Sequence, residues 1–116
     1  MSDYKKHIKE CYRILEEKKA EDIKLLYLGK KSSIADYFLI ANGMADPHIN
    51  ALKNALHASF LKENIQFKNK HDTAKAGWIA VDAFHFVIHL FSREKREFYS
   101  LETLWKDAKE VKIEDL

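Results

Sequence analysis

The chain has 116 residues, of which 47% are hydrophobic and 33% are charged, and its formal net charge is only +2. This length is enough for one domain with a real core, so we predict a single domain over residues 1–116. Lysines and acids are intermixed and there are only three arginines, so the chain lacks the basic tract of proteins that grip phosphate backbones. We therefore expect little or no direct RNA contact.

Cys11 is the only cysteine, which excludes an internal disulfide and a cysteine-based zinc site. Such cysteine usage is typical of a reduced, cytoplasmic setting. The N-terminus is charged, without an apolar signal core, and no run approaches the ~18 apolar residues of a membrane span. We expect a cytoplasmic protein with no membrane partner. Cys11 falls on an apolar helix face, which favours a buried side chain over a reactive thiol.

The first predicted element is an amphipathic helix over about residues 3–19, whose apolar positions recur at helical spacing: Tyr4, Ile8, Cys11, Tyr12 and Leu15. Ile23–Leu28 alternates as a strand does, and Gly29 ends it. After a polar connection, Asp36–Asn42 is apolar on both faces, which indicates a strand in the interior of a sheet.

A second helix is predicted from Asp46, as a carboxylate N-cap, followed by Pro47. Its buried stripe comprises Ile49, Leu52, Leu56 and Phe60, and Asn64 is a suitable stop. Ile65–Lys68 indicates a short edge strand, and the polar segment Asn69–Ala76 a loop.

Two apolar runs, Trp78–Asp82 and Phe86–Phe91, predict two further strands. Ser92 can cap a short helical turn, and Ser100 a helix over Leu101–Ala108. The charged tail from Lys109 is expected to fray. This order of elements predicts an α/β fold, with a mixed sheet of about five strands and helices packed on it.

Six histidines make a metal site the first chemistry to consider. If His85 and His89 lie in one strand, they are about 13 Å apart. Zinc ligands lie within about 2 Å of one ion, so this pair alone cannot chelate. No cluster of histidine, aspartate and glutamate residues has the two-in-a-helical-turn spacing of a zinc protease, and we expect no metal and no cofactor.

Two enzymatic readings also lack their signatures. A serine hydrolase would draw on Ser32, Ser33, Asp36, Asp82 and His89, but no Gly-x-Ser-x-Gly elbow presents a serine. Gly29–Ser33 resembles a phosphate-binding loop only faintly, because the second glycine is absent. Asp36 has no second acid two residues on for two-metal transfer. We expect no enzyme, although nucleotide binding through Lys30, Lys31 and Asp36 stays open.

The remaining feature is a surface rich in aromatic residues and arginine, the types that anchor protein interfaces. Phe98, Leu101 and Trp105 have the helical spacing of residues that close a core. For Trp78 and Tyr99 the sequence indicates core and interface equally.

Four segments of the chain resemble the ribosomal silencing factor (iojap-like) family. They are Ser32–Ile40 for the Ser-Ser-x-x-Asp-Tyr-Phe motif, Gly43 with His48 at a helix start, Trp78, Asp82 and His89 in a strand pair, and Arg96–Ala108 for the Arg-x-Phe-Tyr-x-Leu-Glu-x-Leu-Trp-x-Asp-Ala ending. The match runs over about residues 5–108.

The resemblance implies a fold related to nucleotidyltransferases without their catalytic residues. It implies a translational repressor that binds large-subunit protein fourteen on the intersubunit face and blocks joining of the small subunit. An assembly factor for the large subunit is the alternative, and a homodimer is implied for the free protein. By position, the implied partner-binding residues are Trp78, Asp82, Arg96, Tyr99 and Glu102.

The chain departs from the family at two places. Phe84-His85 stands at a turn where the family usually has Gly-Asp, and because a side chain resists positive φ we expect a different turn type. The second helix starts with Asp46-Pro47 in place of the family's usual Ser-Arg, which removes a positive charge.

Overall fold

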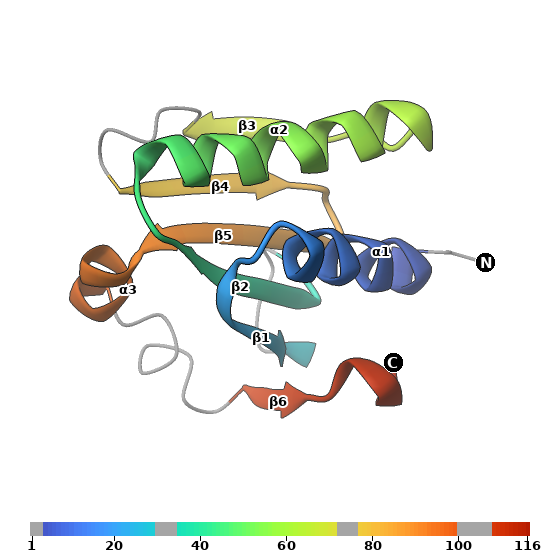
Figure 1. The fold of residues 1–116 in the computed structure, drawn as a ribbon. Coiled ribbons are helices and arrows are strands. Elements are labelled where there is room, and N and C mark those ends of the chain that lie inside the picture. Colours follow the sequence, from blue (N-terminus) through green and yellow to red (C-terminus); the bar gives the residue numbers. More distant parts are fainter. Residues whose placement is uncertain (1–3, 30–34, 72–76, 100–107) are drawn as a thin grey trace.

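The computed structural model describes residues 4–29, 35–71, 77–99 and 108–116, with side chains omitted at 68–71 and 98–99. Figure 1 shows the chain as a sheet with two long helices beside it. In chain order the elements are α1 (Tyr4–Glu17), β1 (Glu21–Tyr27), β2 (Tyr37–Gly43), α2 (Asp46–Lys62), β3 (Lys68–His71), β4 (Trp78–Asp82), β5 (Phe86–Ser92), α3 (Arg93–Tyr99), β6 (Lys109–Val111) and a short 3-10 helix (Ile113–Asp115).

The strands form one mixed sheet in the order β3-β4-β5-β2-β1-β6. β2 and β5 pair in parallel, and the other neighbours pair antiparallel. The predicted α/β class and mixed sheet are confirmed, with the five expected strands present. The tail was expected to fray, and this is wrong: Lys109–Val111 pairs with β1 as a sixth strand.

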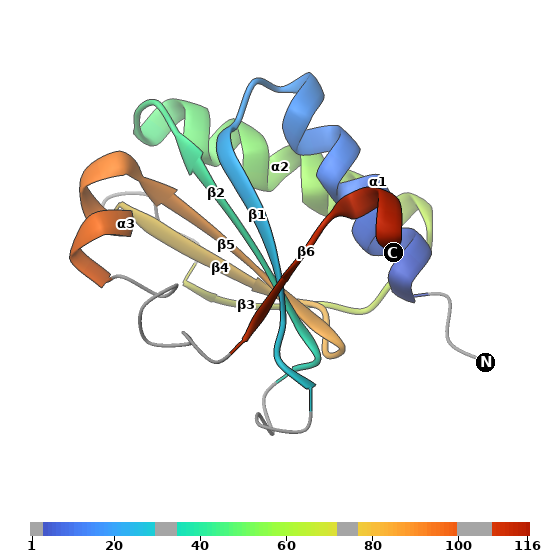
Figure 2. The same ribbon diagram turned by 90° about the horizontal axis from the view of Figure 1, so that it is seen from below.

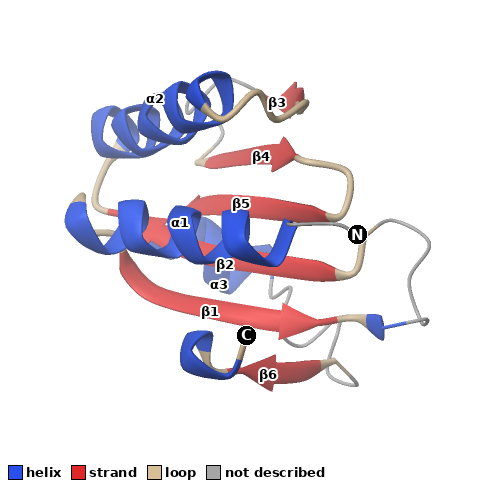
Figure 3. Ribbon diagram, turned by 90° about the vertical axis from the view of Figure 1, so that its right-hand side faces the viewer, coloured by secondary structure: helices blue, strands red, loops and turns tan. Residues whose placement is uncertain are grey.

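The core lies on both faces of this sheet. α1 and α2 cover one face of the sheet, as Figure 2 shows. There, residues of both helices, such as Leu15 and Leu56, pack with alternate residues of the central strands, such as Leu39 and Ile88. Figure 3 looks onto this face, with α1 in front of the sheet and α3 behind it. The opposite face carries a smaller cluster with Phe38, Ile40, Val87 and Phe91, so β2 and β5 are buried on both sides as their unbroken apolar runs predict.

The ends of α2 depend on local chemistry. Asp46 as N-cap is wrong by one residue: Ala45 holds that position, and Asp46 lies in the first turn, where its charge suits the helix dipole. The His48 ring bonds to the chain just before the helix, where its Nδ1 accepts a hydrogen bond from the Met44 N–H at 2.9 Å. Its Nε2 then carries the proton and donates to the Lys18 carbonyl at 2.7 Å, which ties α2 to the end of α1.

Asn64 is confirmed as the stop of α2. It takes φ +57°, and hydrogen bonds run from the Ile65 N–H to the Phe60 carbonyl and from the Asn64 N–H to the Leu61 carbonyl. Because Ile65 is used to close the helix, the edge strand begins later than predicted, at Lys68, and takes in residues expected in the loop. The predicted helix over Leu101–Ala108 lies outside the described residues except for Ala108.

Gly43, at the end of β2, lies against the first turn of α2. A Cβ there would be 2.5 Å from Cγ1 and 3.2 Å from the backbone nitrogen of Ile49, a fully buried residue. We expect Gly43→Ala to lower the free energy of unfolding by about 1–3 kcal/mol, measured by urea denaturation. In the double variant Gly43→Ala/Ile49→Ala the clash with Cγ1 is absent. The double variant should therefore lose less free energy of unfolding than the two single variants lose together. Simple additivity would contradict the close approach.

Cys11 is a buried core residue, as predicted, with 1% of its surface exposed. Burial, and then the nearby charge of Glu10, raise the pKa of its thiol to about 12. Because the thiolate is the reactive form, we expect the native thiol to react with a disulfide reagent at pH 8 at least about a hundredfold more slowly than in the urea-unfolded chain. Comparable absorbance time courses for the two states would contradict this burial.

Candidate functional site

The structure separates the predicted contact residues between two ends of the sheet. Trp78 begins β4 and pairs with Phe91, next to α3, whereas Asp82 ends β4 and pairs with Val87 at the opposite end. Four residues of strand place the two about 13 Å apart. The candidate site therefore divides into an α3 end, with Trp78 and α3, and a hairpin end, with the β4–β5 turn.

Trp78 lies half-buried at the edge of an aromatic cluster. Its ring stacks on Phe91, with centroids 5.7 Å apart and planes inclined by 11°. Its Nε1–H donates a hydrogen bond to Nδ1 of His89 at 3.2 Å. The indole is thus part core and part surface, and its exposed portion is held in a fixed orientation. A rigid, partly exposed tryptophan is a suitable anchor for a protein partner.

His89 alternates with Val87 and Phe91 in the sequence, which predicts a packed core or interface histidine with one hydrogen-bonded nitrogen, and this is confirmed. It is 7% exposed, it meets Phe38 edge-on with centroids 4.6 Å apart, and burial lowers its pKa to about 4. The ring is therefore neutral at physiological pH, with Nδ1 as acceptor and the proton on Nε2. That Nε2 is buried without a hydrogen-bond partner among the described residues. The contact between Trp78 and His89 follows from the β4–β5 register. Ala80 pairs with His89, and Trp78 is two residues from Ala80 on the same face of the sheet.

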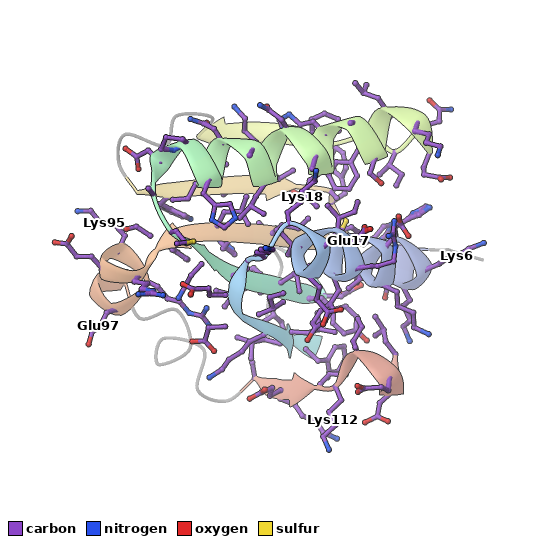
Figure 4. The ribbon with its side chains drawn as sticks, viewed as in Figure 1. Lys6, Glu17, Lys18, Lys95, Glu97 and Lys112 are labelled. Atoms are coloured by element: carbon purple, nitrogen blue, oxygen red, sulfur yellow. The ribbon has the colours of Figure 1, made fainter. Side chains whose placement is uncertain are left out.

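α3 is fixed directly beside Trp78. The Ser92 N–H donates to the Gly77 carbonyl at 2.9 Å, and the Ser92 hydroxyl accepts from the Lys95 N–H at 3.2 Å, which confirms Ser92 as the cap of the short helix. Gly77 has φ +71°, and a Cβ there would be 2.5 Å from Cγ of Lys95. Figure 4 shows Lys95 and Glu97 on α3, at the end of the molecule opposite to Lys6.

The three other predicted residues have different positions. Arg96 is on α3 but is only 6% exposed, and it bonds to other parts of the chain. Tyr99 is the last residue of α3 and its side chain is not described, and Glu102 lies outside the described residues. For all five residues, contact with a partner stays a prediction. The α3 end also carries exposed residues of both charges, namely Arg93, Glu94 and Glu97.

The hairpin end shows a correction. We expected a different turn type because a side chain resists positive φ, yet Phe84 has φ +73°. The Phe84 N–H donates to Oδ1 of Asp82 at 2.8 Å, and the His85 N–H donates to the Ala83 carbonyl at 2.9 Å, which closes a three-residue γ-turn. These bonds offset the strain of the left-handed backbone. Asp82 therefore has an internal role in shaping the turn.

Beside this turn is a cavity of about 410 Å³, lined by residues of α1, the connection after α2 and the hairpin, among them Tyr4, His7, Glu63, Phe84 and His85. The rings of Tyr4 and His85 stack with centroids 4.7 Å apart. The Tyr4 hydroxyl donates to Asp36 at 3.3 Å, so the Asp36 carboxylate also has an internal partner. Lys30 and Lys31, the other residues considered for nucleotide binding, lie outside the described part of the chain.

Within the described residues, no group of three histidine, cysteine or acidic side chains is placed to hold a metal ion. Among the same residues, no helix is both long enough and apolar enough to cross a membrane. The arrangement at the α3 end offers a fixed aromatic side chain with mixed charges around it, which suits binding to a protein surface.

Comparison with known proteins decides the family. The family model described as "Ribosomal silencing factor during starvation" matches residues 1–116. The chain belongs to the RsfS family of ribosomal silencing factors. The Bacillus subtilis ribosomal silencing factor RsfS is 37% identical over 93 residues, which cover 80% of this chain and 79% of that protein.

Two further relatives extend the comparison beyond this RsfS protein. The mouse "Mitochondrial assembly of ribosomal large subunit protein 1" is 31% identical over 100 residues, covering 79% of this chain and 42% of that protein. A crystal structure of a Chromobacterium violaceum protein matches with a TM-score of 0.84 at 24% identity, covering 90% of this chain and 88% of that one. This last likeness supports the fold alone.

Proposed function

We propose that the chain represses translation by binding the large ribosomal subunit in the cytoplasm and sterically blocking the small subunit from joining. Membership of the RsfS family supports the association with ribosomes. The observation that carries the proposal is Trp78, whose indole is fixed by Phe91 and His89 and is left partly exposed beside α3. This mechanism needs affinity and bulk, and no catalytic group.

The protein is large enough to block the contact between two ribosomal subunits. Its dimensions are 36 × 34 × 25 Å, whereas direct contacts between two surfaces require atoms within about 4 Å. A body of this size on the intersubunit face would hold the subunits apart wherever it is bound. Binding alone would therefore block subunit joining, without any conformational change in the ribosome.

The proposed partner on that face is large-subunit protein fourteen. Arg93, Glu94 and Glu97 give the exposed part of α3 charges of both signs, which fits a protein surface better than an RNA backbone. We place Trp78 and α3 at the centre of this contact. The free chain is proposed to form a homodimer, which sedimentation equilibrium would test.

Co-sedimentation with separated small and large subunits, at low and physiological salt, tests the proposal. We expect retention on large subunits only, with little loss at physiological salt, because few phosphate contacts are involved. No retention, or equal retention on both subunits that salt removes, would contradict it.

Assembly of the large subunit is the second candidate, favoured by the name of the mouse relative. A silencing factor binds mature large subunits and prevents joining, whereas an assembly factor is needed before the particle is complete. Sucrose-gradient profiles of cells depleted of the protein separate the two. Accumulation of incomplete large subunits would favour assembly, and normal subunits with more joined ribosomes during starvation would favour silencing.

A further inference from the structure

Among the residues whose side chains are described, Arg96, Asn42 and His89 are the buried charged or polar ones. Arg96 lies on α3, and its Nη1 donates hydrogen bonds to Oδ1 of Asn42 at 2.9 Å and to the Asp22 carbonyl. The Asp22 carboxylate is 3.7 Å away. A buried guanidinium is stable only when its donors are satisfied, so these contacts with β1 and β2 help to fix its position.

The backbone of β1 is shaped for this contact. Asp22 has φ +52°, and the β1–β2 register is interrupted between Glu21 and Lys24. This bulge frees the Asp22 carbonyl from regular pairing and lets it accept from Arg96. Asn42, at the end of β2, is 7% exposed and faces the same guanidinium.

Arg93, one turn earlier on α3, makes the contrasting contact. Its guanidinium pairs with both carboxylate oxygens of Glu21, but its side chain is 70% exposed. Exposed ion pairs contribute little because solvent screens them. The two arginines thus join the same helix to the same strand, one buried and one exposed, and Arg93→Met should therefore leave hydrogen exchange in α3 nearly unchanged.

α3 has only seven residues, too few to be stable as an isolated helix, so its placement depends on what holds it. It adjoins Gly77, the residue before Trp78, through Ser92 and Lys95. We propose that Arg96 is a positioning residue, which fixes α3 beside Trp78 and so pre-forms the binding surface without touching the partner. This inference rests on the proposed function for its effect on binding.

The binding test compares Arg96→Met with Asn42→Leu and with Arg13→Met, which removes an exposed, ion-paired arginine from α1. We expect Arg96→Met to weaken affinity for large subunits about tenfold or more, and Arg13→Met to change it less than about threefold. Asn42→Leu should also weaken binding, although a buried residue on β2 is out of reach of a partner. Arg96→Lys should fail to restore binding, because an ammonium cannot reproduce the planar pattern of donors.

The double variant Arg96→Met/Asn42→Leu separates positioning from contact. An apolar pair can replace a buried polar pair, and the Asp22 carbonyl that loses its donor belongs to an exposed residue that water can reach. Affinity should therefore recover relative to either single variant. If Asn42→Leu binds as the unchanged chain does while Arg96→Met and the double variant do not, Arg96 contacts the partner directly and the proposal is overturned.

Hydrogen exchange gives a readout independent of ribosomes. In Arg96→Met the amides of α3 should lose protection by about tenfold or more, while those of β2 and β5 keep theirs. Unchanged protection of α3 would overturn the proposal even if binding falls. Failure of the unchanged chain to bind large subunits would refute the proposed function, and exchange would still decide the role of Arg96.

Discussion

Trp78→Ala is expected to weaken binding to the large ribosomal subunit by about 2 kcal/mol or more, about thirtyfold in affinity. The substitution removes a ring that Phe91 and His89 hold in place, and with it the exposed aromatic surface beside α3. Quantitative co-sedimentation over a range of subunit concentrations measures the change.

The control for this prediction is Tyr27→Ala, which removes another aromatic side chain, 43% exposed, from β1. It should bind nearly as well as the unchanged chain if Trp78 marks the contact surface. Circular dichroism of both variants checks that they fold. Equal losses in the two variants, or a Trp78→Ala chain that does not fold, would contradict Trp78 as the anchor.

The second large effect is on stability as a function of pH. Burial lowers the pKa of His89 to about 4, against an ordinary value of 6.5. The unfolded chain therefore binds a proton in this range that the folded chain does not. The stability that comes from keeping His89 neutral is fully present above about pH 6.5 and is lost as the pH falls toward 4. This loss lowers the free energy of unfolding by roughly 3 kcal/mol.

Urea denaturation at intervals between pH 7 and 4.5 measures this slope. The carboxyl groups of Glu10 and Glu21 have pKa values lowered from 4.5 by Arg13 and Arg93, so they titrate below the range. His89→Gln should remove most of the slope, and His7→Gln, on α1, should retain it. A slope that persists in His89→Gln would show that another group is responsible.

Local signals in the sequence predicted the helix ends well. Asn64 and Ser92 work through hydrogen bonds to residues within five positions, so their roles can be recognised from the sequence alone. The start of α2 was predicted one residue late, because Ala45 holds the N-cap without a side-chain hydrogen bond. His48 ties this end to the Lys18 carbonyl, just after α1. A bond between distant segments leaves no local pattern.

The candidate site was predicted less completely, for the same reason. Arg96 was carried over as a contact residue, but its burial depends on Asn42 and on a bulge at Asp22, more than fifty residues away in sequence. The sixth strand depends likewise on pairing between the tail and β1. Phe84 has positive φ against its intrinsic preference because Asp82 bonds to its N–H.

The most direct test of the central claim is a subunit-joining assay, in which light scattering follows the association of purified small and large subunits. We predict that the unchanged chain, added to large subunits first, lowers the amplitude of joining in proportion to its occupancy, and that Trp78→Ala at equal concentration does not. Full joining of large subunits that demonstrably carry the bound chain would contradict steric silencing.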